Sequence, residues 1–134
     1  MKEKFSFDGF VPEDFEKHIR QSIPNYSGMR SLIPAIAENF VIKNTNIYDL
    51  GTSSGDLLCE LEDYLADSLE LSYIGYDIAD NLLPSMPSKD INFYKRDVTD
   101  ESLQLFNTSL IFSLFTLQFI DLDKRVKLIQ KVYD

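Results

Sequence analysis

The sequence has few of the residues that build metal centres and disulfide frameworks. Its 134 residues include one cysteine, Cys59, and one histidine, His18. This excludes an internal disulfide, a cysteine-rich zinc site and a metal site with several histidines. The chain also lacks apolar runs of about 18 residues, so we expect no transmembrane helix. The N-terminal segment carries acidic residues early and is unlike a secretory signal.

Basic residues are scarce as well. There are 13 Lys and Arg residues against 22 Asp and Glu residues, which gives a formal net charge of −9. A protein that binds a nucleic-acid backbone needs a basic surface, so direct nucleic-acid binding is not expected. We expect instead a cytoplasmic protein that acts on small molecules, without membrane contact.

Core-forming residues are plentiful. Hydrophobic residues make up 44% of the chain, with 10 Phe and 7 Tyr, so intrinsic disorder is not expected. The length fits one domain with a core of its own. We therefore treat residues 1–134 as a single domain.

Helix-like and strand-like segments alternate along the chain. Two helices are expected first, over 12–23 and 27–40, with Pro34 kinking the second or marking its start. Strands are then expected over 46–50, 71–76, 91–95 and 110–115, and helical segments over 56–66, 79–86 (short helix or turn), 100–106 and 122–133. This alternation predicts an α/β fold with a parallel, Rossmann-like doubly wound sheet and right-handed crossovers.

Apolar spacing predicts which faces are buried. In the second helix it favours Met29, Leu32, Ile33, Ile36 and Phe40, and in the last helix it favours Val126, Ile129 and Tyr133. The segment 110–115 is apolar throughout, as a strand buried on both faces would be.

A glycine turn follows the first expected strand. The sequence Tyr-Asp-Leu-Gly-Thr-Ser-Ser-Gly-Asp over 48–56 runs from strand to helix, which would present open backbone N–H groups at the mouth of the sheet. The turn departs from G-x-G-x-x-G and is a weak signal alone, so a plain strand-to-helix turn remains an alternative. It also fits G-x-S-x-G with Ser53 as nucleophile, but no histidine follows it, which excludes a hydrolase triad. A P-loop is excluded because no Gly-Lys-Ser/Thr follows.

Acidic residues lie at the ends of successive strands. Asp49 lies near the end of the first expected strand, and Asp77 and Asp97 end the second and third. A carboxylate at the position of Asp77 accepts hydrogen bonds from a ribose diol. Asp97 is placed to accept from an adenine amino group, with the Val98 N–H donating to the ring. Each acid alone fits a turn residue or helix cap, but together they favour a nucleoside site.

Other polar residues have simpler readings. We interpret His18 as a surface residue and Cys59 as a small packing residue. The acidic run from Glu60 to Glu70 is most simply a solvated helix face. Tyr26 follows a Pro-Asn pair and is expected to be exposed in a loop, where it is a candidate for ligand contact. Its alternative role is to cap the edge of the core.

Several segments together resemble a known family. Tyr-Asp-Leu-Gly over 48–51, Ile-Gly-Tyr-Asp over 74–77 and Arg-Asp-Val over 96–98 resemble motifs of class I S-adenosylmethionine-dependent methyltransferases. Ile-Arg-Gln-Ser-Ile-Pro-Asn-Tyr-Ser over 19–27 and Phe-Thr-Leu-Gln-Phe over 115–119 are more specific and resemble the bacterial carboxy-S-adenosylmethionine synthases. That family converts S-adenosylmethionine and prephenate to carboxy-S-adenosylmethionine and phenylpyruvate, and a partner enzyme uses the product to modify wobble uridine in tRNA.

The resemblance implies a cofactor site for S-adenosylmethionine or carboxy-S-adenosylmethionine. Tyr26 and Asp49 would contact the methionine part, and the glycine turn would cradle it. Asp77 would hold the ribose, and Asp97 and Val98 would hold the adenine. The residues implied to bind the cofactor are Tyr26, Asp49, Gly51, Thr52, Ser53, Asp77, Ile78, Asp97, Val98 and Ser113.

The chain also departs from that family. Ser113 replaces an asparagine, and the family's three further strands, which supply an arginine for the carboxylated substrate, do not follow. Among Arg20, Arg30, Arg96 and Arg125 none takes that arginine's place by position. The four strands would lie in the order 3-2-1-4 and leave the fourth at an edge, so we expect self-association near 110–115. A cofactor-binding module without turnover, or part of a methyltransferase with another acceptor, remain alternatives.

Overall fold

The strands form one parallel sheet. The computed structural model describes residues 6–84, 88 and 90–134. The sheet contains β1 (Asn46–Leu50), β2 (Ser72–Asp77), β3 (Ile91–Lys95) and β4 (Thr108–Phe112), and their order is β3-β2-β1-β4. All three strand pairings are parallel. The predicted α/β class and the order 3-2-1-4 are thus confirmed.

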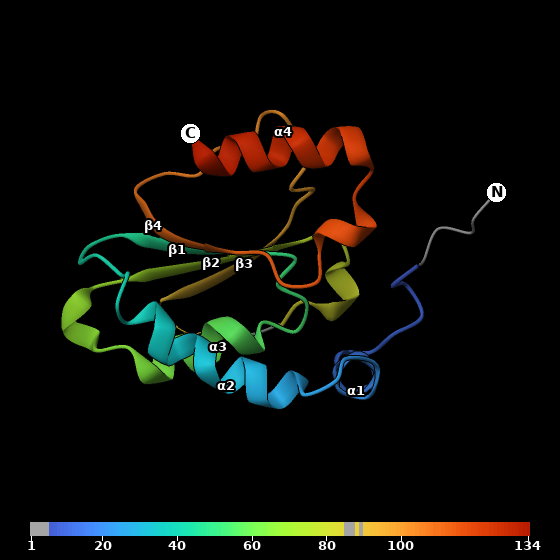
Figure 1. Ribbon diagram of the computed structural model, residues 1–134, viewed down its shortest axis with the longest axis horizontal. Helices are drawn as coiled ribbons and strands as arrows, with labels where there is room; N and C mark the ends of the chain where they lie inside the picture. The colour runs from blue at the N-terminus through green and yellow to red at the C-terminus, as the bar shows by residue number, and fades with distance from the viewer. Residues whose placement is uncertain (1–5, 85–87, 89) are drawn as a thin grey trace.

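Helices cover both faces of the sheet (Figure 1). On one face lie α2 (Tyr26–Ala37) and α3 (Asp56–Tyr64), and on the other lies α4 (Leu122–Tyr133). The first helix, α1 (Pro12–Ser22), precedes α2. Short 3-10 turns complete the chain: η1 (Asp67–Leu69), η2 (Asp80–Leu82) and η3 (Leu117–Phe119). The predicted segment 79–86 contains η2, and its residues 85 and 86 lie outside the described residues.

Local sequence explains where the site-forming helices begin. The helix α1 starts at Pro12, whose fixed φ suits a first turn, and Glu13 and Asp14 complement the positive end of the helix dipole. The helix α3 follows Gly55, which has φ +78°, a conformation that glycine adopts without steric cost. Leu57, Leu58 and Leu61 then share the buried side of α3 and join Ile47 and Ile91 in the core beneath the sheet.

The expectations for residues 100–115 are wrong in three respects: the helix, the bounds of the fourth strand and the burial of that strand. Residues 100–106 form a turn and an extended loop rather than a helix. The fourth strand covers 108–112 rather than 110–115, and every one of its residues is half-buried rather than buried, because it forms the sheet edge. Its side chains still pack on both faces, with Leu110 and Phe112 against one core cluster and Ile111 against the other. Self-association through this edge stays a prediction, which light scattering tests.

The buried faces of two helices also differ from expectation. The helix α2 buries Tyr26, Arg30, Pro34 and Ala37, whereas the apolar residues expected inside are largely exposed: Leu32, Ile36 and Phe40. The helix α4 buries Leu128 alone, and its predicted apolar face is exposed at Val126, Ile129 and Tyr133. Hydrophobic spacing identified these helices correctly but not the side that contacts the sheet.

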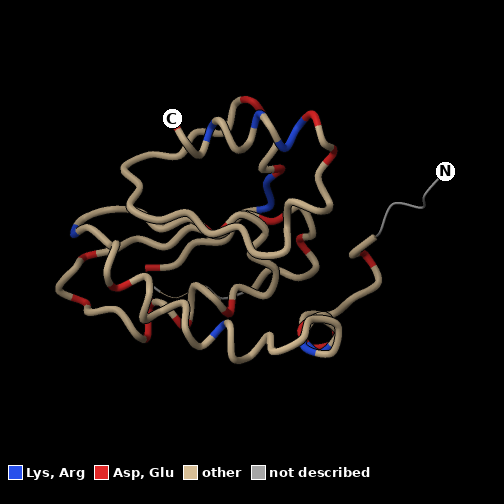
Figure 2. Tube along the Cα trace, in the orientation of Figure 1, with Lys and Arg blue, Asp and Glu red and all other residues tan. Residues whose placement is uncertain are grey.

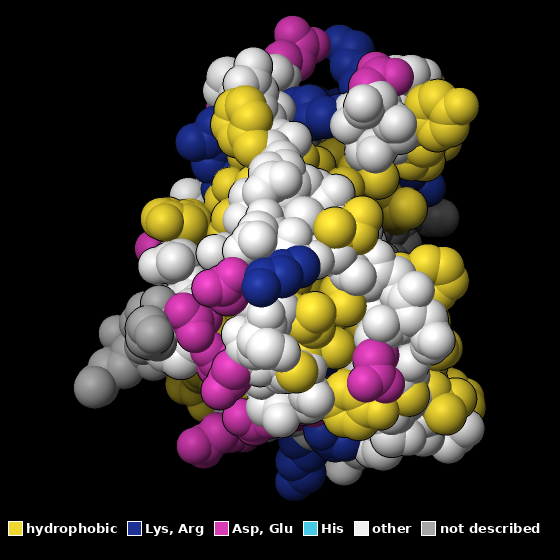
Figure 3. Space-filling model, turned by 90° about the vertical axis from the view of Figure 1, so that its left-hand side faces the viewer, with side chains coloured by type: hydrophobic (Ala, Val, Ile, Leu, Met, Phe, Trp, Pro, Cys, Tyr) yellow, Lys and Arg dark blue, Asp and Glu magenta, His cyan; other side chains and the backbone are white. Residues whose placement is uncertain are grey.

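Charge is unevenly distributed over the layers. Lys and Arg positions are frequent along α4, whereas acidic positions gather in the layer of α3 and the turn after it (Figure 2). The face in Figure 3 shows acidic side chains along one side of that layer. The predicted acidic face is therefore largely a solvated one. None of the helices in the described part of the chain is both long and apolar enough to cross a membrane.

Candidate functional site

The carboxyl end of β1 is joined to distant segments of the chain. Gly51 follows β1 with φ +87°, and a Cβ atom there would overlap the Thr116 side chain. The Thr116 hydroxyl donates to the Leu50 carbonyl at 3.0 Å. Glycine is thus required at 51 both by the backbone conformation and by the close approach of Thr116.

The backbone donors of the glycine turn are already used. The N–H groups of Gly51 and Thr52 donate to the Tyr76 carbonyl at 2.8 and 2.9 Å. The Ser53 N–H donates to Asp77 Oδ2 at 2.8 Å. The expectation that this turn offers open N–H groups is wrong for these three positions, because the turn uses them to hold the ends of β1 and β2 together.

Asp77 ends β2 and is held by backbone donors. Its Oδ1 accepts from the Ala79 N–H at 2.9 Å, and its Oδ2 accepts from Ser53. Burial raises the pKa of Asp77, and these hydrogen bonds oppose that shift. Each carboxylate oxygen has a further lone pair, so the fixed carboxylate can still accept from a ligand's hydroxyls. Ile78 follows and is 60% exposed.

Asp49 is the most deeply buried acid of this region. It is 3% exposed and lies on β1 between Gly75 of β2 and Phe112 of β4. Burial raises the pKa of Asp49 to about 7, while the polar Thr52 side chain and the charge of Arg30 act in the opposite direction. A carboxyl group in such a place is stabilised as an anion by a cationic partner.

Three buried hydroxyl groups lie in the same segments. Thr52 Oγ1, Ser53 Oγ and Ser113 Oγ have no hydrogen-bond partner among the described residues. Buried polar atoms are normally paired, and an unpaired one costs free energy. Ser113 directly follows the point where β4 pairs with Asp49. The end of the β1–β4 pair therefore holds hydroxyl groups that a polar ligand would satisfy.

Tyr26 is buried rather than exposed in a loop. It begins α2 and is 6% exposed, because its ring lies 5.9 Å from that of Phe115. Its hydroxyl oxygen accepts from Arg30 Nη1 at 2.7 Å. Tyr26 thus links the start of α2 to the segment after β4, as its alternative role at the edge of the core requires.

Sequence analysis missed the charged residues around Tyr26. The guanidinium carbons of Arg20 and Arg30 lie 5.7 and 5.6 Å from the centre of its ring. Arg20 pairs with Glu16 at 3.0 Å, and Arg30 pairs with Glu60 at 3.0 Å. The helical spacing of Tyr26 and Arg30 was the available signal, since residues four apart share a helix face.

Asp97 and Val98 follow β3, which ends at Lys95, so Asp97 lies in the turn after the strand rather than at its last residue. Asp97 is exposed and accepts from the N–H and hydroxyl of Thr99, which lowers the pKa of Asp97. The Val98 side chain packs into the core on the α4 side, next to Tyr48 and Leu128. Asp97 therefore stabilises its own turn through Oδ1, and these two hydrogen bonds leave Oδ2 unused.

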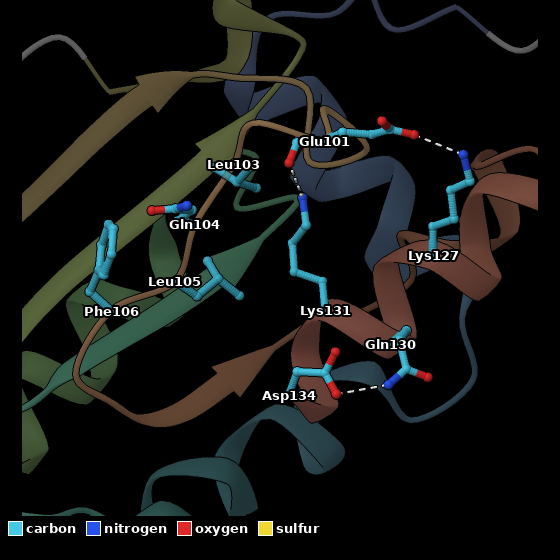
Figure 4. Close-up of a pocket in the computed structure, with 9 residues that line it drawn as sticks. All are labelled: Glu101, Leu103, Gln104, Leu105, Phe106, Lys127, Gln130, Lys131 and Asp134. Atoms are coloured by element: carbon cyan, nitrogen blue, oxygen red, sulfur yellow. Dashed lines mark hydrogen bonds and ion pairs between the residues drawn. The ribbon is translucent and has the colours of Figure 1, made fainter.

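A separate hollow lies between α4 and the loop 101–106 (Figure 4). Its polar side chains pair with one another: Glu101 with Lys127 at 2.7 Å, and Gln130 with Asp134 at 2.8 Å. Lys131 donates to the Asp100 carbonyl at 2.7 Å. The hollow is lined by none of the residues that the sequence assigns to a cofactor, and its lining lacks the buried acids found at the end of β1.

Comparison with known proteins identifies the relatives of this chain. Carboxy-S-adenosyl-L-methionine synthase of Staphylococcus epidermidis is 34% identical over 124 residues, which cover 90% of this chain and 53% of that protein. The synthase of Nitratiruptor sp. is 33% identical over 140 residues, which cover 100% of this chain and 57% of that protein. The chain is a relative of the carboxy-S-adenosyl-L-methionine synthases. It spans about half the length of the curated relatives it matches, and no family model matches it.

Solved structures confirm the fold of this synthase relative. An S-adenosylmethionine-dependent methyltransferase from Aquifex aeolicus superposes with a TM-score of 0.58 at 17% identity, covering 92% of this chain and 67% of that one. A protein from Methanococcus maripaludis described as a methyltransferase of the same kind gives 0.66 at 16% identity, covering 98% and 62%. The fold is that of class I methyltransferases.

The segments that resemble the synthases meet in space. Tyr26, from the segment 19–27, contacts Phe115, from the segment 115–119, and Thr116 is hydrogen-bonded to the end of β1. Segments almost ninety residues apart thus lie next to each other, and the second of them is joined to the end of β1.

Proposed function

We propose that this chain is a single S-adenosylmethionine-binding domain whose site is the carboxyl edge of the sheet. The observation that carries the proposal is the pair of buried, unpartnered hydroxyl groups of Ser53 and Ser113, which lie in the segments that flank the buried carboxyl of Asp49. The described residues that line the hollow beside α4 include no comparable set of buried, unpartnered polar atoms. The kinship with the synthases supports the same location.

The residues of this edge fit the parts of S-adenosylmethionine. Asp49 is placed to pair with the α-ammonium group, and the hydroxyl groups are placed to hydrogen-bond the methionine end. Tyr26 closes that end. Asp77 accepts from the ribose hydroxyls, and the exposed Ile78 packs beside the nucleoside. Asp97 and the Val98 N–H bind the adenine edge.

The proposed reaction is that of the relatives. Prephenate loses its ring carboxylate as carbon dioxide and its ring hydroxyl as hydroxide, and becomes phenylpyruvate. The S-methyl group gives a proton to that hydroxide, which leaves as water, and its carbon bonds to the carbon dioxide. The product, carboxy-S-adenosylmethionine, serves tRNA wobble-uridine modification in the cytoplasm. The residues of this chain position the cofactor and exclude water from its methionine end. Because the chain matches about half of each relative, a second candidate is a cofactor-binding module without turnover.

Calorimetry tests the cofactor site directly. We expect this chain to bind S-adenosylmethionine at pH 8, where Asp49 is ionised, and Asp77→Ala to weaken binding at least tenfold. The control is Asp80→Ala, which removes an exposed acid paired with Lys95 and should leave binding unchanged. Circular dichroism establishes that both variants are folded.

Two outcomes would count against the proposal. Absence of binding by the parent chain would remove the cofactor site, and equal affinity of the parent and Asp77→Ala would place the ligand elsewhere. If binding is found, incubation with prephenate and mass spectrometry distinguishes the candidates. Formation of carboxy-S-adenosylmethionine supports the synthase, and its absence with intact binding supports the module.

A further inference from the structure

Arg30 is a buried cation with incomplete partners. It is 6% exposed, and its Nε has no hydrogen-bond partner in the described part of the chain. Its Nη1 donates to Tyr26 and its Nη2 pairs with Glu60. A guanidinium taken out of water requires compensating partners, so an open Nε beside the candidate site points to a ligand.

The partner of Nη2 can move away. The Glu60 side chain is 43% exposed, so solvent can accommodate it if a competing anion arrives. The edge formed by Nε and Nη2 of an arginine binds a carboxylate through two parallel hydrogen bonds. Tyr26 holds the opposite edge at 2.7 Å and thereby orients the guanidinium.

The charge of Arg30 complements that of Asp49. The positive charge of Arg30 acts to lower the pKa of Asp49, and both side chains are buried. A neighbouring buried cation and buried acid match the two charges of an α-amino acid end. Arg20, in contrast, is 44% exposed at its side chain and is already paired with Glu16 and Ser27.

We propose that Arg30 binds a ligand carboxylate through its Nε–Nη2 edge, with Tyr26 orienting the guanidinium and Asp49 taking the adjacent ammonium group. The inference rests on the proposed cofactor site. The same chemistry has two sources, the α-carboxylate of S-adenosylmethionine and a carboxylate of the second substrate. The buried carboxyl of Asp49 suits an α-ammonium group and thereby favours the first source.

The test compares two cofactor forms by calorimetry at pH 8. Decarboxylated S-adenosylmethionine retains the nucleoside and the amine but lacks the α-carboxylate. We expect the parent chain to bind S-adenosylmethionine about tenfold more tightly than this analogue, since a charged hydrogen-bonded pair is lost. Arg30→Gln should abolish that preference by weakening the binding of S-adenosylmethionine alone. Arg20→Gln is the matched control and should preserve the preference.

Two further arms complete the design. Arg30→Lys keeps the charge without the bidentate edge, so it should restore part of the preference and show that the effect of Arg30→Gln is not general misfolding. Prephenate is then titrated into each variant saturated with cofactor. Loss of prephenate binding in Arg30→Gln with an unchanged cofactor preference assigns the carboxylate to the second substrate.

A failure of the proposed role of Arg30 can be distinguished from a failure of the proposed cofactor site. If the parent chain binds neither cofactor form, the proposed function fails, and this inference fails with it. If the parent binds both forms and Arg30→Gln keeps the parent's preference and the parent's response to prephenate, the role of Arg30 is overturned while the cofactor site stands.

Discussion

The carboxyl edge of the sheet and the hollow beside α4 differ in how their polar groups are partnered. At the carboxyl ends of β1 and β4, an acid and three hydroxyl groups are buried, and the hydroxyl groups have no hydrogen-bond partner among the described residues. In the hollow beside α4, each charged side chain has a partner: Glu101 pairs with Lys127, Asp134 accepts from Gln130, and Lys131 donates to the Asp100 carbonyl. The hollow is thus lined by charged side chains that already have partners. Unsatisfied buried chemistry indicates the ligand site better than concavity does.

The largest expected effect comes from filling the space at Gly51. Gly51→Ala places a Cβ atom against Thr116 and on a backbone with φ +87°. We expect the free energy of unfolding to fall by about 1–3 kcal/mol and cofactor binding to be lost. Chemical denaturation and calorimetry measure the two effects.

The control for this change is Gly9→Ala, because nothing lies within 4 Å of a Cβ atom there. It should leave both stability and binding unchanged. If Gly51→Ala kept its stability and its binding, the carboxyl edge of the sheet would tolerate a larger side chain. The contrast between this edge and the hollow beside α4 would then be lost.

The second prediction concerns the pH dependence that Asp49 creates. Burial raises the pKa of Asp49 in the folded state to about 7, whereas the ordinary pKa of an aspartate is 3.8. Between these values the folded state binds more protons than the unfolded state, so this group lowers the free energy of unfolding as pH rises from about 4 to 7. We expect Asp49→Asn to remove that part of the decline in thermal denaturation.

Cofactor affinity should follow the opposite trend. Ionised Asp49 attracts the α-ammonium group, so the affinity of the parent chain for S-adenosylmethionine should rise between pH 6 and 8. Asp49→Asn should bind about tenfold more weakly at pH 8 and lose this rise. An unchanged pH profile in Asp49→Asn would separate Asp49 from the ligand.

Sequence reasoning succeeded where a single pattern dictates the structure. The alternation of strands and helices predicted the parallel sheet, the family resemblance supplied the strand order 3-2-1-4, and the acids Asp49 and Asp77 lie at its carboxyl edge. It failed where tertiary contacts compete with hydrophobicity. The helix α2 turns Tyr26 and Arg30 inward, because their hydrogen bond and the ring of Phe115 partner them there, and Ile36 is left outside. The donors of the glycine turn bind the backbone of β2, which no local motif reveals.

A smaller effect is expected from the unpartnered hydroxyl of Ser113. Ser113→Ala removes a buried polar atom without a partner in the described structure, so the stability of the free protein should be unchanged or slightly higher. S-adenosylmethionine binding should weaken by about two- to tenfold.

The contrasting variant is Ser109→Ala in β4. The Ser109 hydroxyl accepts from Thr45 Oγ1 at 2.7 Å, so its removal should lower the melting temperature without changing affinity. Together the two variants distinguish a hydroxyl group that binds the ligand from one that stabilises the fold. A loss of stability in Ser113→Ala with unchanged binding would reverse that assignment.

The smallest effect is expected in the hollow beside α4. Lys127→Met breaks the ion pair with Glu101, whose two side chains are 69% and 80% exposed. Exposed pairs contribute little because water and salt screen them, so any fall in melting temperature should vanish at high salt. The affinity for S-adenosylmethionine should equal that of the parent chain. A weakened affinity would place the ligand in this hollow, and the buried hydroxyl groups at the other end of the sheet would then need a different explanation.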